Sequence, residues 1–252
     1  MTEPHVILIT GATGAIGAAL AEAYAQPGTT LHLQGRDQLR LDEVAARCRS
    51  RGAATHVVRL DLREHAALLS WLGRLGTIDL AVINAGVNAH VGTDGTPEPW
   101  DAAEAVVDVN LKAAMAVVHG VLPAMRARGC GQVALIGSLA GWFGLPATPA
   151  YSASKAGLRA YGESLRGWLG PRGIRVSVVM PGYVSSAMCD AMPGPKPFLW
   201  QPARAAAAIR RGLARDRARI CFPVPLSWGC RALSMLPATV AIRILRWLGY
   251  GR

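Results

Sequence analysis

The chain has 252 residues, which is enough for one large α/β domain with a full hydrophobic core. Hydrophobic residues make up 51% of the chain and the mean hydropathy is +0.25, which excludes a disordered protein. The net charge of +11 is unevenly placed, because residues 200–252 contain ten Arg and a single Asp. The five cysteines form no CxxC pair, which favours reduced thiols and a cytoplasmic protein.

No stretch near the C-terminus predicts a membrane span. The longest charge-free runs there, Ile220–Cys230 and Ala232–Ile242, each contain 11 residues, which is too short to cross a bilayer. The chain enters a strand-like run, HVILIT, almost at its first residue, so we expect no signal peptide.

The first predicted unit is a strand, a glycine-rich turn and a helix. The run HVILIT leads into a turn with Gly11, Gly14 and Gly17, and the Ala-rich segment AALAEAYAQ follows. Glycines at such a junction let the backbone approach a pyrophosphate, and the N-terminus of the next helix favours its negative charge. The pattern predicts a dinucleotide site, with a tight turn for close strand–helix packing as the alternative.

The second predicted strand, LHLQG, ends at Gly35 and is followed by Arg36, nineteen residues after Gly17. At this place a dinucleotide-binding domain meets the adenosine ribose, and a carboxylate would grip the ribose hydroxyls. A small residue followed by a guanidinium suits a 2′-phosphate instead. We therefore expect NADP rather than NAD, although Arg36 could be an ordinary solvated residue.

Two further strand ends place polar or small residues at the same edge. THVVRL is followed by Asp61 and Leu62, and Asp61 could accept from an adenine amino group or cap the next helix. The strand IDLAVI ends in Asn84-Ala85-Gly86. Small residues there permit close approach of a cofactor, while Asn84 could also tie neighbouring strands together.

The remaining pattern continues the alternation of strands and helices. A long helix is predicted from Trp100 to about Arg128, and it contains Asn110, a residue that helix propensity disfavours. QVALIGS, GIRVSVVMPGYV and RARICFPV are the fifth, sixth and seventh predicted strands, and a basic helix is predicted over Pro202–Arg219. Such alternation predicts a single α/β domain over residues 1–252, with a doubly wound parallel sheet covered by helices on both faces.

A candidate catalytic group lies between residues 138 and 155. Tyr151 and Lys155 are four residues apart in a helix-forming segment, so both side chains lie on one helix face. A phenol titrates near pH ~10, and a neighbouring ammonium lowers that pKa towards the range useful for acid–base work. Ser138 follows the apolar run QVALIG, where it could hydrogen-bond a substrate carbonyl.

The C-terminal quarter offers a substrate lid and a basic tail. The proline-rich segment Tyr183–Gln201 follows the sixth strand and is expected to cover the substrate. In the tail, residues 225–252, an apolar helical stripe with Arg beside it suits an interfacial helix on anionic lipid or packing on the domain or a second subunit. The stripe consists of Val240, Ile244, Leu245 and Leu248. The aromatic residues Trp142, Phe143, Tyr183 and Trp200 could line an apolar substrate pocket or belong to the core, and His90 is expected to be solvated.

Taken together, these motifs resemble the short-chain dehydrogenase/reductase family, in its compact single-domain branch. The resemblance covers about residues 4–188 and consists of TGATGAIG at 10–17, DL at 61–62, NAG at 84–86, Asn110, Ser138, YSASK at 151–155 and PGYVSS at 181–186. It implies a metal-free oxidoreductase with a Rossmann-like fold that transfers a hydride between NADP(H) and a carbonyl or secondary alcohol substrate. It also implies a homodimer or homotetramer assembled through the long helices beside the active site.

The resemblance also implies residue roles. Tyr151 would be the general acid or base, Lys155 would hold the nicotinamide ribose, Ser138 would orient the carbonyl and Asn110 would anchor a water of the proton relay. The residues that it places around the cofactor are Gly11, Thr13, Gly14, Ile16, Gly17, Arg36, Asp61, Leu62, Asn84, Ala85, Gly86, Tyr151, Lys155, Pro181, Gly182, Val184 and Ser186.

The sequence departs from the family pattern at the phosphate turn, where Gly14 is followed by Ala15 and the compact branch has its glycine one place later. The form TGxxGxxG is more typical of the longer, epimerase-like branch, but this chain lacks room for a sugar-nucleotide domain. The alternative from another class is a non-catalytic NADP-binding sensor or scaffold whose tail binds a membrane or a partner. No recognition motif accompanies the arginines, so we expect no nucleic-acid partner.

Overall fold

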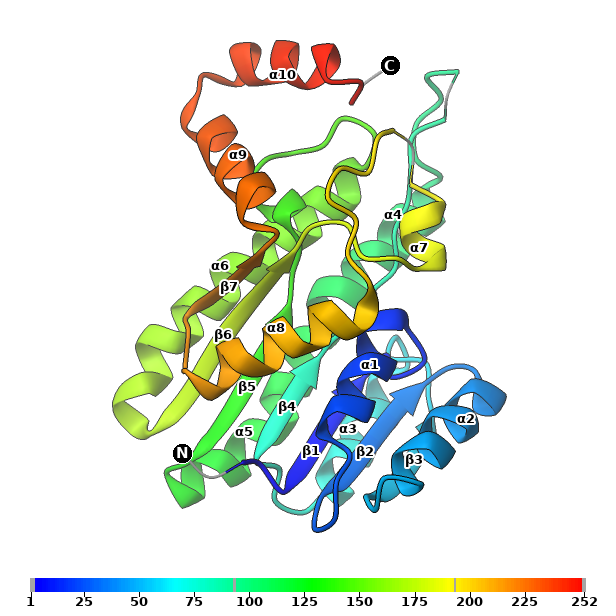
Figure 1. The fold of residues 1–252 in the computed structure, drawn as a ribbon, viewed down its shortest axis with the longest axis vertical. Coiled ribbons are helices and arrows are strands. Elements are labelled where there is room, and N and C mark those ends of the chain that lie inside the picture. The colour runs from blue at the N-terminus through cyan, green and yellow to red at the C-terminus, as the bar shows by residue number, and fades with distance from the viewer. Residues whose placement is uncertain (1–2, 93, 193, 251–252) are drawn as a thin grey trace.

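The computed structural model describes residues 3–92, 94–192 and 194–250. Seven parallel strands form one sheet in the order β3-β2-β1-β4-β5-β6-β7, which confirms the predicted fold class (Figure 1). The strands are β1 (Val6–Thr10), β2 (Thr30–Gly35), β3 (Ala54–Arg59), β4 (Leu80–Ile83), β5 (Gly131–Ile136), β6 (Ile174–Pro181) and β7 (Arg219–Phe222).

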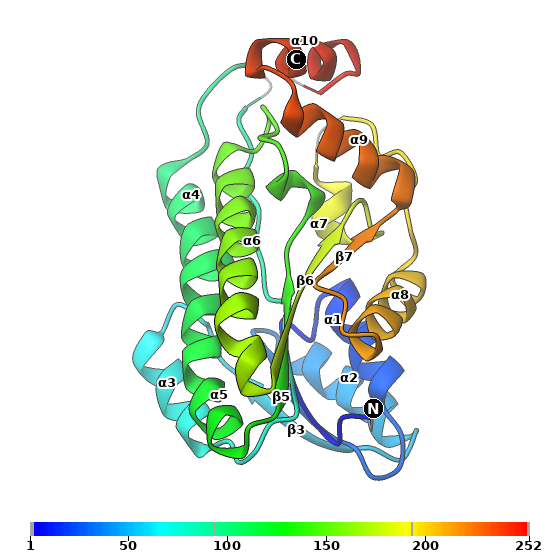
Figure 2. The same ribbon diagram turned by 90° about the vertical axis from the view of Figure 1, so that its left-hand side faces the viewer.

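Helices alternate with the strands along the chain. The α-helices are α1 (Ala15–Tyr24), α2 (Gln38–Arg49), α3 (His65–Arg74), α4 (Trp100–Val107), α5 (Ala114–Arg128), α6 (Pro149–Leu169), α7 (Ala187–Asp190), α8 (Pro202–Ala214), α9 (Val224–Met235) and α10 (Ala238–Trp247). Helices α1, α2 and α8 cover one face of the sheet, and α3, α5 and α6 cover the other (Figure 2).

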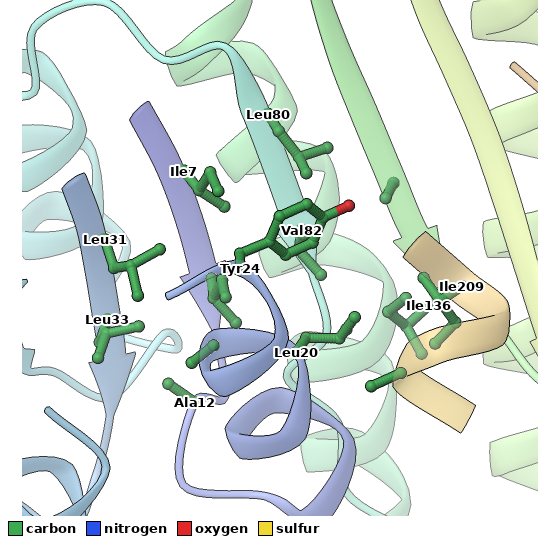
Figure 3. Packing of buried hydrophobic residues seen from close by; sticks show 14 of the residues in the cluster. Ile7, Ala12, Leu20, Tyr24, Leu31, Leu33, Leu80, Val82, Ile136 and Ile209 are labelled. Atoms are coloured by element: carbon green, nitrogen blue, oxygen red, sulfur yellow. The ribbon is translucent and has the colours of Figure 1, made fainter. Parts of the chain in front are cut away.

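The two layers arise from the alternation of side chains along each apolar strand. Ile7 of β1 packs in the same cluster as Leu20 of α1 (Figure 3). Ile9 belongs to this cluster too, whereas Leu8 packs in the cluster on the opposite face. Both clusters are buried, and each fully buried Leu or Ile contributes roughly 2 kcal/mol to folding. A sheet that is apolar on both faces therefore needs helices on both sides.

The predicted long helix is continuous from Trp100 to Arg128, although it changes character in the middle. Residues Asp108–Ala113 form a π-helical stretch, η1, between α4 and α5. Within the described residues this is the one helix long and apolar enough to span a membrane by length and composition, and half of its apolar window is buried. Val117, Val121 and Met125 pack in the core against the sheet, so it is a core helix.

The strand order reverses beside β1, which pairs with both β2 and β4. In open α/β sheets ligands bind at the carboxyl ends of the strands next to such a reversal. Strands β1, β4, β5 and β6 all end at this edge, and most of the residues predicted to be functional lie in the segments that follow them. Helices α9 and α10 lie beyond the same edge in both views, so the tail forms a helical cover (Figures 1 and 2).

Candidate active site

A cavity of about 640 Å³ runs along the carboxyl edge of the sheet, from the turn after β1 to α9 and α10. It brings together all but one of the predicted cofactor-binding residues. Those that line it are Gly11, Thr13, Gly14, Ile16, Arg36, Asp61, Leu62, Asn84, Ala85, Gly86, Tyr151, Lys155, Pro181, Gly182, Val184 and Ser186. Ser138 lines it as well, whereas Gly17 and Asn110 lie behind the cavity wall.

The three candidate catalytic side chains meet at the middle of this cavity. Ser138 follows β5 and begins a short 3₁₀ turn, where its hydroxyl accepts from the amide of Ala140 at 3.1 Å. Tyr151 and Lys155 lie on the first turns of α6, and Ser138 hydrogen-bonds the Tyr151 hydroxyl. The Lys155 Nζ lies 5.7 Å from the centre of the Tyr151 ring. The spacing of four residues therefore places the phenol and the ammonium on one side of the helix.

Burial dominates the electrostatics of this group. It raises the pKa of Tyr151, and the hydrogen bond from Ser138 opposes that rise. Burial also lowers the pKa of Lys155 to about 8, and its ammonium donates to the carbonyl of Ile136 at 2.8 Å. Before a cofactor is bound, desolvation of the phenol therefore sets the direction of the Tyr151 pKa, and it is Ser138 rather than the expected ammonium that opposes the rise.

Asn110 lies in the π-helical stretch and is fully buried. Its side chain accepts from the Val87 amide at 2.8 Å and donates to the Val87 carbonyl at 3.0 Å and to the Ser154 hydroxyl at 3.1 Å. It therefore joins the segment after β4 to the helix of Tyr151. These hydrogen bonds explain why a residue of low helix propensity occurs in the middle of this long helix. π-Helical turns are also frequent at functional sites.

The turn after β1 requires glycine at two positions. Gly11 has a left-handed backbone, and Gly17 lies too close to a neighbouring backbone to carry a Cβ. Gly11 has a φ of +64°, and a Cβ there would lie 2.7 Å from the Cα of Ala85. A Cβ on Gly17 would overlap the carbonyl oxygen of Gly11, so Gly17 serves helix packing rather than the cavity surface. Gly14 is the N-cap residue of α1 with an ordinary φ of −76°, and a Cβ there would lie 3.3 Å from the Gly11 carbonyl oxygen.

This geometry predicts opposite outcomes for two alanine substitutions in the turn. Gly17→Ala is expected to destabilise the protein by about 1–3 kcal/mol through overpacking, although alanine favours a helix interior over glycine by about 1 kcal/mol. Gly14→Ala is expected to change the free energy of unfolding by less than about 1 kcal/mol, because its neighbour has to move only slightly. Urea unfolding of both variants measures this, and a stable Gly17→Ala protein would contradict the assigned packing role.

Asn84 performs the structural role that we considered for it and also lines the cavity. Its amide nitrogen donates to the carbonyls of Thr10 and Gly11 at 3.2 and 3.0 Å, which fixes the turn after β1 against the end of β4. The nearby Gly86 packs against Asn110, because a Cβ there would lie 3.2 Å from the Asn110 Oδ1.

The far end of the cavity, beside β2, is basic. Arg36 and Arg40 are both exposed and line the cavity on either side of the start of α2, which Asp37 caps through the Arg40 amide at 3.2 Å. The sequence analysis did not single out Arg40. Its signal was the position four residues after Arg36, about one helical turn further along the chain, and both side chains line the cavity.

Asp61 does not cap the following helix, because the N-cap residue of α3 is Glu64. One Asp61 oxygen accepts from the Arg63 amide at 3.0 Å, and the other pairs with the Arg63 guanidinium at 2.7 Å. This hydrogen bonding holds the pKa of the Asp61 carboxyl below its usual range. Asp61 therefore lines the cavity as an ionised group.

The end of the cavity beyond Tyr151 is largely apolar. Of the four aromatic residues considered for a substrate pocket, Phe143 and Tyr183 line it, whereas Trp142 and Trp200 do not. The side chains that α9 and α10 add to the wall are Leu226, Cys230, Leu233, Leu245 and Leu248. The sequence analysis missed these residues as cavity walls, although their helical spacing was visible.

Tyr250 connects the C-terminal helices to the segment Tyr183–Gln201. Its hydroxyl donates to the carbonyl of Pro195 at 2.9 Å, and it also hydrogen-bonds Tyr183. Both tyrosines line the cavity, and burial raises the pKa of each. The predicted lid segment and the tail thus close the cavity together.

His90 is partly buried and not fully solvated as expected, and burial lowers its pKa. Its Nδ1 atom is buried without a hydrogen-bond partner in the described part of the chain. The side chain does not line the cavity, so the structure gives His90 no place among the groups that face it.

Comparison with known proteins places this architecture in a family. A model of the short chain dehydrogenase family matches residues 5–194, and the chain belongs to the short-chain dehydrogenase/reductase family of oxidoreductases. An uncharacterized oxidoreductase of Myxococcus xanthus is 34% identical over 234 residues, which cover 91% of this chain and 92% of the relative.

Solved structures share the fold along most of the chain. A short-chain dehydrogenase from Sphingobium yanoikuyae in complex with NADPH has a TM-score of 0.80 and 28% identity, covering 87% of this chain and 88% of that one. A bulky-bulky ketone specific alcohol dehydrogenase from Comamonas testosteroni has a TM-score of 0.77 and 25% identity, covering 89% and 88%.

Proposed function

We propose that this protein is an NADP(H)-dependent oxidoreductase that interconverts a carbonyl compound and a secondary alcohol. The observation that carries the proposal is the convergence of Ser138, Tyr151 and Lys155 on one cavity that extends from the glycine turn to an apolar chamber. A sensor needs the cofactor-binding half of this cavity, but it has no need for a phenol, a hydroxyl and an ammonium placed together.

The residues present fit a nicotinamide dinucleotide. The Gly11–Ile16 turn and the start of α1 offer backbone donors to a pyrophosphate, and Lys155 offers an ammonium to a ribose. Arg36 and Arg40 line the cavity after the end of β2, and two guanidiniums at this place suit a 2′-phosphate. Once bound, the cofactor supplies or accepts the hydride at the carbonyl carbon.

The residues of the chain then manage the charge that develops on the substrate oxygen. We assign Tyr151 as the donor of the proton to this oxygen in reduction, and as the acceptor of the alcohol proton in oxidation. Ser138 holds the oxygen beside the phenol through its hydroxyl. The positive charge of Lys155 favours the phenolate left after the proton has moved, and Asn110 holds the backbone that supports this group.

The substrate end favours a rather apolar compound. Its walls are formed by aliphatic and aromatic side chains of the segment after β5, the lid segment and α9. No carboxylate lines this end among the described residues; the acidic lining residue, Asp61, lies at the adenosine end. A medium-sized apolar ketone or secondary alcohol fits this chemistry, as in the ketone-specific neighbour from Comamonas testosteroni.

Coenzyme choice provides the test of the proposed cofactor. We expect the wild-type protein to bind NADPH at least about tenfold more tightly than NADH, and Arg36→Ala to weaken NADPH binding about tenfold to a hundredfold while NADH binding stays within about threefold. Fluorescence titration of the reduced cofactors measures both constants. Arg74→Ala on α3 is the matched control, because its guanidinium contacts Ser70 away from the cavity. Equal binding of the two cofactors by the wild type would refute the NADP assignment.

We also propose a homodimer or homotetramer in the cytoplasm. The helices beside the active site present exposed apolar side chains, among them Val107, Met115 and Trp168, and these are suited to contact between copies of the chain. All five cysteines are free, in keeping with a reducing compartment.

A further inference from the structure

Helix α9 is apolar on two opposite sides. Its inner side, with Leu226 and Leu233, lines the cavity. Its outer side bears Val224, Trp228 and Met235, which follow one another at intervals of four and seven residues and are 62%, 66% and 76% exposed. A helix with apolar residues on both sides is expected to be covered on both sides, and the described residues cover only the inner one.

Helix α10 repeats this arrangement and adds positive charge. Ala241 and Leu245 are buried towards the body of the protein, so part of the predicted apolar stripe packs on the domain. The outward residues include Trp247, which is 85% exposed, and the exposed Arg243 and Arg246. Neither arginine forms an ion pair with any carboxylate in the described part of the chain.

The sequence that forms these helices contains no compensating acid. After Asp216 the sequence has no Asp or Glu to its end, while six Arg follow. The lid segment adds Phe198 and Leu199, which share a shallow hollow with Val224. The two helices project beyond the edge of the sheet, clear of both helical layers, so a broad surface can reach them (Figures 1 and 2).

Charge and aromatic content together decide between possible partners. A second copy of the chain, docked on the same face about a two-fold axis, would bring unpaired arginines against arginines. A nucleic acid would use the arginines but leave the apolar outer stripe of α9 without a partner. An anionic bilayer surface offers partners to the apolar side chains and to the arginines. Tryptophan side chains lie at the headgroup level, and arginines pair with lipid phosphates.

We propose that the outer faces of α9 and α10 bind the surface of an anionic lipid bilayer. We call these residues, Val224, Trp228, Met235, Val240, Arg243, Arg246 and Trp247, the C-terminal outer face. The inner sides of the same helices form the substrate end of the cavity, so binding brings that end to the membrane. The inference goes beyond the proposed reaction and does not depend on it, since it concerns adsorption alone.

Vesicle flotation of the full chain tests the proposal. We expect the wild type to float with vesicles of phosphatidylcholine and phosphatidylglycerol at three to one, to stay unbound with pure phosphatidylcholine, and to be released by 0.5 M salt to a large extent. Trp228→Ser/Trp247→Ser is expected to weaken binding about tenfold or more, and Arg243→Gln/Arg246→Gln by a similar factor. NADPH affinity and thermal stability of these variants should remain unchanged, because none of the four side chains lines the cavity.

Matched controls remove equally exposed groups elsewhere. Leu39→Ser/Leu69→Ser takes apolar surface from α2 and α3, and Arg211→Gln/Arg215→Gln takes charge from α8 and its end; both should bind vesicles like the wild type. The proposal is overturned if the wild type ignores anionic vesicles, or if controls and variants lose binding alike. A shift of the Trp228→Ser/Trp247→Ser variant to a smaller oligomer in light scattering would assign the face to a second copy, and retention of duplex DNA without vesicle binding would assign it to a polyanion.

Discussion

Tyr151→Phe is expected to reduce turnover of a carbonyl substrate by about a hundredfold to ten-thousandfold, the range for loss of a positioned general acid. The phenol hydrogen-bonds Ser138 at the cavity, and in the proposed reaction it protonates the developing alkoxide. The substitution removes one oxygen atom and keeps the aromatic ring. Binding of NADPH should therefore change by less than about threefold, so kcat falls while the cofactor Kd stays.

Tyr161→Phe is the matched control, because Tyr161 lies on the same helix and packs in the core on the α3/α5/α6 face of the sheet, outside the cavity. It should retain wild-type turnover. A Tyr151→Phe protein that reduces its substrate at the wild-type rate would show that another group donates the proton. A wild type that binds NADPH but turns over no carbonyl compound in a broad screen would favour the alternative of a cofactor-binding sensor or scaffold.

Much of the fold and of the catalytic group follows from local patterns in the sequence. Apolar strands such as HVILIT need cover on both faces, which fixes a parallel sheet between helix layers. Parallel strands end at one edge of the sheet. The proximity of residues that follow different strands, such as Ser138 and Asn84, can therefore be predicted from the sequence alone. The helical spacing of Tyr151 and Lys155 requires only the geometry of one helix.

The residues whose place was not predicted correctly share a physical cause. Their positions depend on the angle between two secondary-structure elements, whereas the sequence pattern describes one element at a time. Leu226 and Leu233 line the cavity because α9 turns back over the edge of the sheet after β7, and no local signal sets that direction. Trp142 does not line the cavity, because its ring packs against guanidiniums instead, with that of Arg159 lying 4.6 Å from the ring centre. Arg40 lines the cavity because of the direction in which α2 leaves the end of β2.

The buried ammonium of Lys155, to which we assign a role in the proposed reaction, lowers the stability of the folded protein. Its pKa falls from 10.5 to about 8 because burial disfavours the ammonium, while an unfolded chain keeps the ordinary value. Between these two pH values the unfolded chain binds more protons than the folded one, so this group makes the protein more stable as the pH rises through that window. Below pH ~8 the full penalty applies, on the order of 3 kcal/mol.

Lys155→Met is therefore expected to lower turnover roughly a hundredfold or more and at the same time to change the pH dependence of stability. The free energy of unfolding of the variant, relative to the wild type, should be most favourable near pH 7 and should decline by about 3 kcal/mol towards pH ~10.5, because only the wild type gains stability there. Urea unfolding across this range measures the difference, and Lys112→Met, at an exposed lysine paired with Asp108, should show no such trend. If the difference between Lys155→Met and wild type does not depend on pH, the ammonium is not paying a burial cost and the assigned protonation chemistry of the site is wrong.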